Sequence, residues 1–416
     1  MVGSRVNALR VLLWVVAVLA FGLATQLPLR ITTGSWQAHV PKVGAQSLAS
    51  YLVAIGLATS IGAVLLHLYG IGRLLPIAAV LGLVAALLSA DYVQRATAPN
   101  DALDAAFGAG WQDELSPTAT EWMLQRRWQW QLPGGSEPRW DRDVLYATVP
   151  DADRELLADI WQPPEGVEPS GLGLVYVHGG YYELLDKDSG TRPLFRHLTR
   201  QGHVVMDISY RLVDETDIVG MIHDVKLATA WLAAQADRYR IDPDRIVLAG
   251  ASSGGNLALL AAYSHAHPDL TPDDIGTEPK AHGVVAYYGV HDWPAFARLD
   301  DPDGQQLRER LLGGDIDEVA DRYALASPIT HVDADTPATL LIQGLHDVQH
   351  LVDANRRLAV ELTRAGVPVA NVELARTDHA FDLILPQIAP AGMAALHDLE
   401  RFLAILATHD ERTAHD

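Results

Sequence analysis

The sequence predicts an α/β domain, with a mostly parallel central sheet and helices on both faces, preceded by a transmembrane helical region. Three observations support this prediction. From residue 141 onward, short apolar runs of β type alternate with runs of helical spacing, a pattern typical of parallel sheets. Three long apolar runs occupy residues 1–95. A Gly-x-Ser-x-Gly turn separates a β-type run from a helical run at residues 250–254.

The composition excludes several classes of function. The 416 residues are 49% hydrophobic, which is enough for a large core and for more than one folded unit. The formal net charge of -21 argues against a nucleic-acid partner, because such a partner requires a basic surface. The absence of cysteine excludes disulfides and thiolate nucleophiles. No metalloprotease, P-loop or dinucleotide-binding motif is present, so neither a metal site nor a nucleotide site is expected.

Three transmembrane helices are expected within residues 1–95. Each apolar run approaches the ~20 residues that a helix needs to cross a bilayer, so the lipid bilayer is an expected partner. The runs are residues 11–29, 47–69 and 74–90. Arg5 and Arg10 before the first run also suit a cleaved signal peptide, but the two later runs would still anchor the chain.

The orientation of this multi-pass anchor in the cell membrane is weakly specified. The basic residues that flank the runs are divided equally between the two sides, so the positive-inside rule gives no clear answer. The two arginines that precede the first run favour an N-terminus inside the cell. Three spans then place the rest of the chain outside the cytoplasm.

Residues 96–140 form a polar connector, and residues 141–410 form the α/β domain. Within the connector, residues 120–131 interleave Trp with Arg and predict an amphipathic helix. This helix would lie at the membrane interface or pack as a lid on the domain that follows. Residues 295–326 form a long segment between two expected strands, which makes them a candidate insertion that shapes a substrate pocket.

The strands and helices of the α/β domain follow from its apolar runs. The first two expected strands form an antiparallel pair, and the others alternate with helices. A site in such a sheet lies at the carboxyl ends of the strands. The expected strands are residues 144–148, 156–161, 172–177, 204–209, 246–249, 284–288, 339–342 and 369–374. The expected helices are residues 193–201, 222–237, 253–264, 351–365 and 393–407.

Ser252 is the candidate nucleophile. It stands in Gly250-Ala251-Ser252-Ser253-Gly254-Gly255, directly after a β-type run and before a helical run. A nucleophilic serine in this context sits on a tight, strained turn that projects its hydroxyl from the sheet edge. Gly250 and Gly254 keep Cβ atoms out of a bend where neighbouring segments nearly touch. The helix that begins there directs N–H groups at the reacting centre.

His379 and Asp347 are the candidate base and acid. Acyl transfer by serine requires a base for the hydroxyl proton and a carboxylate that orients this base. Asp347 and His379 each follow an expected strand, in the chain order serine, acid, histidine. Asp378 adjoins His379, but neighbouring side chains diverge in an extended segment. The competing candidates are His346 and His350 for the base, and Asp353 and Asp378 for the acid.

Gly179, Gly180 and Ser253 are the candidate oxyanion-hole residues. A tetrahedral intermediate needs one N–H group from the residue after the nucleophile and another from the loop after the third strand. Ser253 supplies the first. Gly179 and Gly180 follow the expected strand 172–177 and let the backbone approach a substrate. His178 is expected to brace this loop rather than to take part in the chemistry.

Together these blocks resemble the hormone-sensitive-lipase-like family of α/β-hydrolase esterases, and with the hydrophobic N-terminus the chain looks most like its membrane-anchored carboxylesterases. The resemblance implies an α/β-hydrolase fold, ester hydrolysis without a cofactor, a Ser252–Asp347–His379 triad, and oxyanion donors Gly179, Gly180 and Ser253. The matching blocks are His178-Gly179-Gly180, Ser209-Tyr210-Arg211-Leu212, the elbow at 250–255, Tyr287-Tyr288-Gly289-Val290-His291-Asp292, Ser327-Pro328 and His379-Ala380-Phe381.

Three departures from the family pattern leave the substrate open. Ala251 and Ser253 replace the usual Asp and Ala of the elbow, Tyr181 replaces a third glycine, and Val213-Asp214 replaces the usual Ala-Pro. The chain is expected to be a membrane-anchored serine carboxylesterase whose small-molecule ester substrates carry short-chain or lipid-like acyl groups. The alternatives are an amidase or arylformamidase with the same triad, and a non-catalytic hydrolase-fold module that binds membranes.

Overall fold

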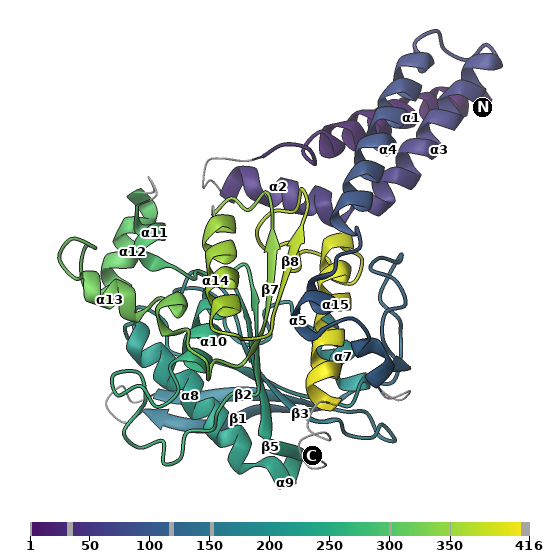
Figure 1. The fold of residues 1–416 in the computed structure, drawn as a ribbon. Coiled ribbons are helices and arrows are strands. Elements are labelled where there is room, and N and C mark those ends of the chain that lie inside the picture. The colour runs from purple at the N-terminus through teal and green to yellow at the C-terminus, as the bar shows by residue number, and fades with distance from the viewer. Residues whose placement is uncertain are drawn as a thin grey trace.

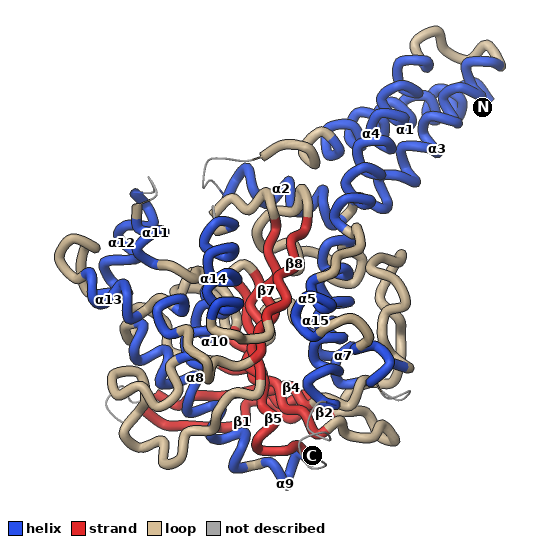
Figure 2. Tube along the Cα trace, viewed as in Figure 1, coloured by secondary structure: helices blue, strands red, loops and turns tan. Residues whose placement is uncertain are grey.

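The computed structural model describes residues 2–30, 36–115, 120–149, 154–298, 302–349 and 351–408. A bundle of long helices, α1, α3 and α4, projects from one side of an α/β domain, as the ribbon in Figure 1 shows. The N-terminus lies near the distal end of this bundle, and the C-terminal end lies on the opposite side of the α/β domain. Sheet strands occupy the centre of the domain, with helices around them (Figure 2).

The bundle helices are long and apolar enough to cross a membrane. They are α1 (Val2–Ala24), α3 (Ala49–Leu68) and α4 (Leu75–Ala96), and the candidate spans within them are Val6–Ala24, Ala49–Leu68 and Leu75–Ala96. α3 and α4 pack closely through Gly56 and Gly82, because a Cβ atom at Gly56 would lie 2.5 Å from the carbonyl oxygen of Gly82. Exposed side chains such as Leu19 and Leu87 cover the outer surface, which suits contact with lipid rather than with water.

Helix α2 (Trp36–Ser47) lies between the first two bundle helices in the sequence and was not expected from it. It runs across the ends of strands β7 and β8, at the base of the bundle (Figure 1). Unlike its neighbours, α2 is too short and too polar to be a span. This helix brings polar side chains of the N-terminal region onto the edge of the sheet where the candidate site lies.

The described strands form one eight-stranded sheet in the order β1-β2-β4-β3-β5-β6-β7-β8. β2 is antiparallel to β1 and β4, and the remaining neighbours are parallel. Every expected strand is present, and the predicted antiparallel pair is confirmed. The strands are β1 (Arg139–Val149), β2 (Arg154–Gln162), β3 (Gly171–Val177), β4 (Val204–Ile208), β5 (Ile241–Ala251), β6 (Gly283–Tyr287), β7 (Ala338–Gly344) and β8 (Val369–Leu374).

Helices cover both faces of the sheet, which confirms the expected fold class. Alternate strand residues face opposite cores: Val175 packs with α8 and α10, whereas Tyr176 packs with α7 and α15. The helices are α5 (Ala102–Phe107), α7 (Arg192–Arg200), α8 (Ile218–Ala234), α9 (Ala236–Tyr239), α10 (Ser253–Tyr263), α11 (Trp293–Ala297), α12 (Pro302–Leu312), α13 (Ala320–Leu325), α14 (Val352–Arg364) and α15 (Pro390–Thr408), with 3₁₀ helices η1 (Trp111–Glu114) and η3 (Pro328–His331).

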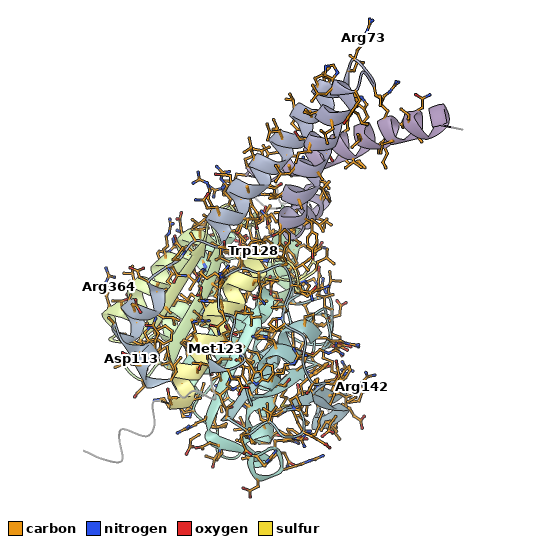
Figure 3. The ribbon with its side chains drawn as sticks, turned by 90° about the vertical axis from the view of Figure 1, so that its right-hand side faces the viewer. Arg73, Asp113, Met123, Trp128, Arg142 and Arg364 are labelled. Carbon is orange, nitrogen blue, oxygen red and sulfur yellow. The ribbon has the colours of Figure 1, made fainter. Side chains whose placement is uncertain are left out.

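The amphipathic helix predicted for residues 120–131 is wrong. Residues 121–131 form turns and bends, because α15 binds their backbone and so replaces helical hydrogen bonds. The Leu124 N–H donates to Glu400 Oε1 at 2.7 Å, and Arg401 donates to the Leu124 carbonyl at 2.9 Å. The segment nevertheless lies beside the bundle: Trp130 packs edge-on against Tyr51 of α3. Figure 3 labels Trp128 at the base of the bundle.

Candidate active site

Ser252 stands on a strained turn between β5 and α10. Its φ of 56° is unfavourable for any residue with a side chain, and the glycines around it leave room for the bend. A Cβ atom at Gly250 would lie 2.3 Å from the carbonyl oxygen of Gly254, and one at Gly254 would lie 2.0 Å from that of Val177. The Ser252 N–H donates to the Tyr287 carbonyl at 2.8 Å, which ties the turn to β6. The sequence therefore produces the geometry of a nucleophile elbow.

Gly254→Ala tests this elbow directly. We expect the substitution to lower the free energy of unfolding by about 3 kcal/mol, because the added methyl group meets backbone oxygens that cannot move aside. Thermal unfolding of the detergent-solubilised chain measures the change. Gly134→Ala is the matched control, since a Cβ atom there meets nothing within 4 Å. An unfolding temperature equal to that of the control would contradict the assignment.

The carboxyl ends of β7 and β8 bring Asp347 and His379 to Ser252. His379 Nε2 lies 2.9 Å from Ser252 Oγ, and His379 Nδ1 lies 2.9 Å from Asp347 Oδ2. Both Asp347 and His379 are almost fully buried. Because a carboxylate only accepts hydrogen bonds, Nδ1 carries the proton and Nε2 is left to accept from the serine hydroxyl. The three side chains thus have the geometry of a serine–histidine–aspartate triad.

Further hydrogen bonds orient the Asp347 carboxylate. Gln343 Nε2 donates to Oδ2 at 2.7 Å, and the Gln349 N–H donates to Oδ1 at 2.7 Å. Gln343 belongs to β7, so the strand itself fixes the acid. Gln349 also donates through its side chain to the Tyr181 hydroxyl, which connects the acid loop to the loop after β3.

The competing acids and bases take other positions. Asp378 is fully buried but accepts from the N–H groups of His379 (2.8 Å) and Val348 (2.9 Å), and it pairs with Lys42 rather than with the histidine ring. Asp353 is exposed on α14. The pKa of His346 is lowered by burial, and His346 is not placed between Ser252 and Asp347. His350 lies outside the described residues.

The loop after β3 lies against Ser252. A Cβ atom at Gly179 would lie 2.7 Å from the Ala251 carbonyl oxygen and 3.3 Å from Ser252 Cβ, and Gly180 has a φ of 127°. Within the described chain, the N–H groups of Gly179, Gly180 and Ser253 have no protein acceptor. Donors without partners beside the serine fit the predicted oxyanion hole.

His178 stacks on Tyr210, with ring centroids 4.4 Å apart, and the Tyr210 hydroxyl donates to the His178 carbonyl at 3.0 Å. Burial lowers the pKa of His178, so the ring is neutral at pH 7. These contacts match the bracing role expected for this residue. Tyr182, from the same loop, donates to Asn256 Oδ1 of α10 at 2.9 Å and fixes the loop to the helix after the elbow.

Two pockets meet at Ser252 and His379. The larger of the two is an apolar cavity of about 310 Å³, the smaller has a volume of about 30 Å³, and Tyr181 lines both. Side chains that line the larger one include Tyr176, Leu184, Leu185, Tyr288 and Leu383. Side chains that line the smaller one include Tyr182, Trp293, Phe296, Leu307 and Leu351.

Residues of the predicted insertion 295–326 reach the smaller pocket, as expected, whereas residues 120–131 line neither pocket. In the described part of the chain, no group of three or more histidine, aspartate or glutamate side chains is arranged to hold a metal ion.

Sequence reasoning missed the contribution of α2. Lys42, His39 and Gln46 of this helix contact the segment that carries His379. The only signal in the sequence is a lysine and a histidine in a short stretch between two apolar runs, which does not reveal a distant partner. Tyr288 was also missed as a neighbour of the base: its ring centroid lies 4.4 Å from that of His379.

Comparison with known proteins shows which family the chain resembles. A family model described as BD-FAE matches residues 158–362, which contain the elbow, the loop after β3 and the candidate acid. The chain is similar to this family, whose model covers just under half of its length, and it has the α/β-hydrolase fold. Among solved structures, the α/β-hydrolase resembles esterase 2 of Thermogutta terrifontis in its propionate-bound form, with a TM-score of 0.52 and 23% identity over 65% of this chain and 93% of that one. This likeness shows the fold.

Curated relatives of the α/β-hydrolase include esterases. A probable carboxylic ester hydrolase of Mycobacterium tuberculosis, LipM, is 32% identical over 64% of this chain and 61% of its own length. Neutral cholesterol ester hydrolase 1 of Rattus norvegicus is 37% identical over 23% of this chain and 24% of its own. The chain thus covers less than two thirds of the relatives that it matches.

Proposed function

We propose that the chain is a membrane-anchored serine carboxylesterase. The observation that carries the proposal is the pair of 2.9 Å contacts that link Ser252, His379 and Asp347 in series. Ser252 attacks the ester carbonyl while His379 takes its proton, and Asp347 stabilises the resulting imidazolium. The Gly179, Gly180 and Ser253 N–H groups hold the oxyanion. His379 then protonates the leaving alcohol, and water releases the acid from the acyl-enzyme.

The pockets support an ester with one short and one larger apolar substituent. The 310 Å³ cavity is lined mainly by aromatic and leucine side chains, so each methylene buried there contributes about 0.8 kcal/mol to binding. The 30 Å³ pocket leaves room only for a short group. Esterase 2 of Thermogutta terrifontis, which has the same fold, has been solved with propionate and with butyrate bound. These small acids agree with a short acyl group in one of the two pockets.

The apolar helical bundle favours the interpretation that the enzyme acts on its substrate at a membrane. The bundle tip at Arg73 and the N-terminus lie away from the α/β domain (Figures 1 and 3). At the domain end, Lys42 and Arg95 are paired with Asp378 and Asp91, whereas Arg10 and Arg73 of the bundle form no ion pair with the described side chains. The proposed orientation has the distal end in the cytoplasm and the α/β domain outside it.

An ester series tests this function. With p-nitrophenyl esters of increasing acyl length, kcat/KM is expected to rise about fourfold per methylene until the accommodating pocket is full, and then to fall. Membranes that carry Ser252→Ala provide the background rate. Faster turnover of N-formyl anilides than of every ester would favour the amidase alternative. No turnover of either class, with no labelling by a fluorophosphonate, would favour a non-catalytic module.

A further inference from the structure

Helix α2 touches the segment that carries the proposed base at several points. Lys42 Nζ lies 2.7 Å from Asp378 Oδ2, and both side chains are 0% exposed. His39 Nδ1 lies 3.6 Å from Asp378 Oδ1, and the His39 ring centroid lies 6.5 Å from that of His379. Gln46 donates to the carbonyl of Arg376 at 2.9 Å and accepts from the Asp378 N–H at 3.3 Å. These contacts cover the residues immediately before His379.

The Asp378 carboxylate connects the base and the acid. Its Oδ1 atom accepts from the N–H of His379 at 2.8 Å and from the N–H of Val348, the residue after Asp347, at 2.9 Å. A movement of Asp378 therefore displaces both loops at the carboxyl ends of β7 and β8. This single side chain sets the relative positions of two members of the triad.

A buried carboxylate in this position needs a counter-charge. An isolated buried charge is costly, and removing one partner of a buried ion pair costs more than removing both. Lys42 supplies the positive charge from α2. Burial by itself would raise the pKa of Asp378, but the adjacent His39 side chain and the charge of Lys42 outweigh it and hold this pKa at about 2. The carboxylate thus stays ionised and keeps its two backbone donors.

We propose that α2 completes the catalytic unit, and that Lys42 is a positioning residue that holds His379 in line with Ser252 through Asp378. This inference rests on the proposed serine-hydrolase function. Helix α2 is joined to candidate membrane spans. The reactivity of Ser252 therefore depends on how the N-terminal anchor packs against the α/β domain, so the anchor has a role beyond attachment to the membrane. A second link, the ion pair of Arg376 with Asp91 of α4, connects the same segment to the bundle.

Lys42→Met in the full-length, detergent-solubilised chain tests the proposal. We expect the rate constant for fluorophosphonate labelling, and kcat for a p-nitrophenyl ester, to fall about 10- to 100-fold. KM should change less than about threefold, because Lys42 lines neither pocket. The extent of labelling after long incubation should stay near that of the wild type, since the protein remains folded. Lys280→Met, which removes a half-exposed lysine paired with Asp335, is the matched control.

The double variant Lys42→Met/Asp378→Asn separates positioning from simple loss of stability. The introduced amide oxygen still accepts from the two backbone N–H groups and needs no counter-charge, so we expect recovery to within about fivefold of the wild-type rate. Wild-type rates in Lys42→Met, a reduced extent of labelling with an unchanged rate constant, or a double variant as slow as the single one would each overturn the proposal. A wild-type chain that neither labels nor hydrolyses esters would instead refute the proposed function.

Discussion

Ser252→Ala is expected to lower kcat for a p-nitrophenyl ester by on the order of 10⁶-fold, the loss typical of a serine nucleophile that acts with its histidine. The alanine methyl group cannot form the acyl-enzyme, and water is poorly placed to replace the hydroxyl. The elbow itself remains, because its shape depends on Gly250 and Gly254 rather than on the serine hydroxyl. The purified variant is to be assayed in detergent beside the wild type.

The exposed Ser136 provides the control for this variant. Ser136→Ala should hydrolyse the ester within about twofold of the wild-type rate, since surface substitutions of this kind have small effects. Ester turnover by Ser252→Ala above about 1% of the wild-type rate, after removal of contaminating esterases, is incompatible with Ser252 as the nucleophile.

Asp347→Asn is expected to lower kcat by about 10⁴-fold while KM changes little. The amide introduced beside His379 Nδ1 can donate a hydrogen bond to that atom, which leaves the proton on Nε2. An Nε2 that carries a proton cannot accept from the Ser252 hydroxyl, which lies 2.9 Å away. Hydrolysis of the same p-nitrophenyl ester over a range of concentrations separates kcat from KM.

Asp353→Asn, on the exposed surface of α14, is the matched control and should retain wild-type activity. If Asp353→Asn lost its activity while Asp347→Asn remained nearly active, Asp353 rather than Asp347 would be the acid of the triad. Such a result would also conflict with the 2.9 Å contact between Asp347 and His379.

The candidate nucleophile can be predicted from the local sequence around it, whereas the base and the acid are predicted from their order along the chain. The turn around Ser252 is encoded within six residues, because glycines are required wherever backbone oxygens approach within 3 Å of a Cβ position. Asp347 and His379 were selected from several competitors by their places after two buried strands. In the structure these strands, β7 and β8, are neighbours, so their carboxyl ends meet at one edge of the sheet.

Features that depend on distant contacts were not predicted. Helix α2 contains Pro41 and Gly44, which are poor helix formers, and its amphipathic pattern is weak. The helix is held against the sheet edge by the buried ion pair of Lys42 with Asp378, a residue that lies far away in the sequence. The error at residues 120–131 has the same origin: their spacing suits a helix, but Glu400 and Arg401 of α15 bind the backbone in another conformation.

The most direct test of the account is the site and rate of fluorophosphonate modification in the full-length chain. Mass spectrometry of the labelled protein is predicted to find the adduct on Ser252. His379→Gln is predicted to slow its formation by about 10³-fold or more, because the hydroxyl then lacks a base. An adduct on a different residue, or modification of Ser252 at an undiminished rate in His379→Gln, would contradict the proposal that His379 activates Ser252.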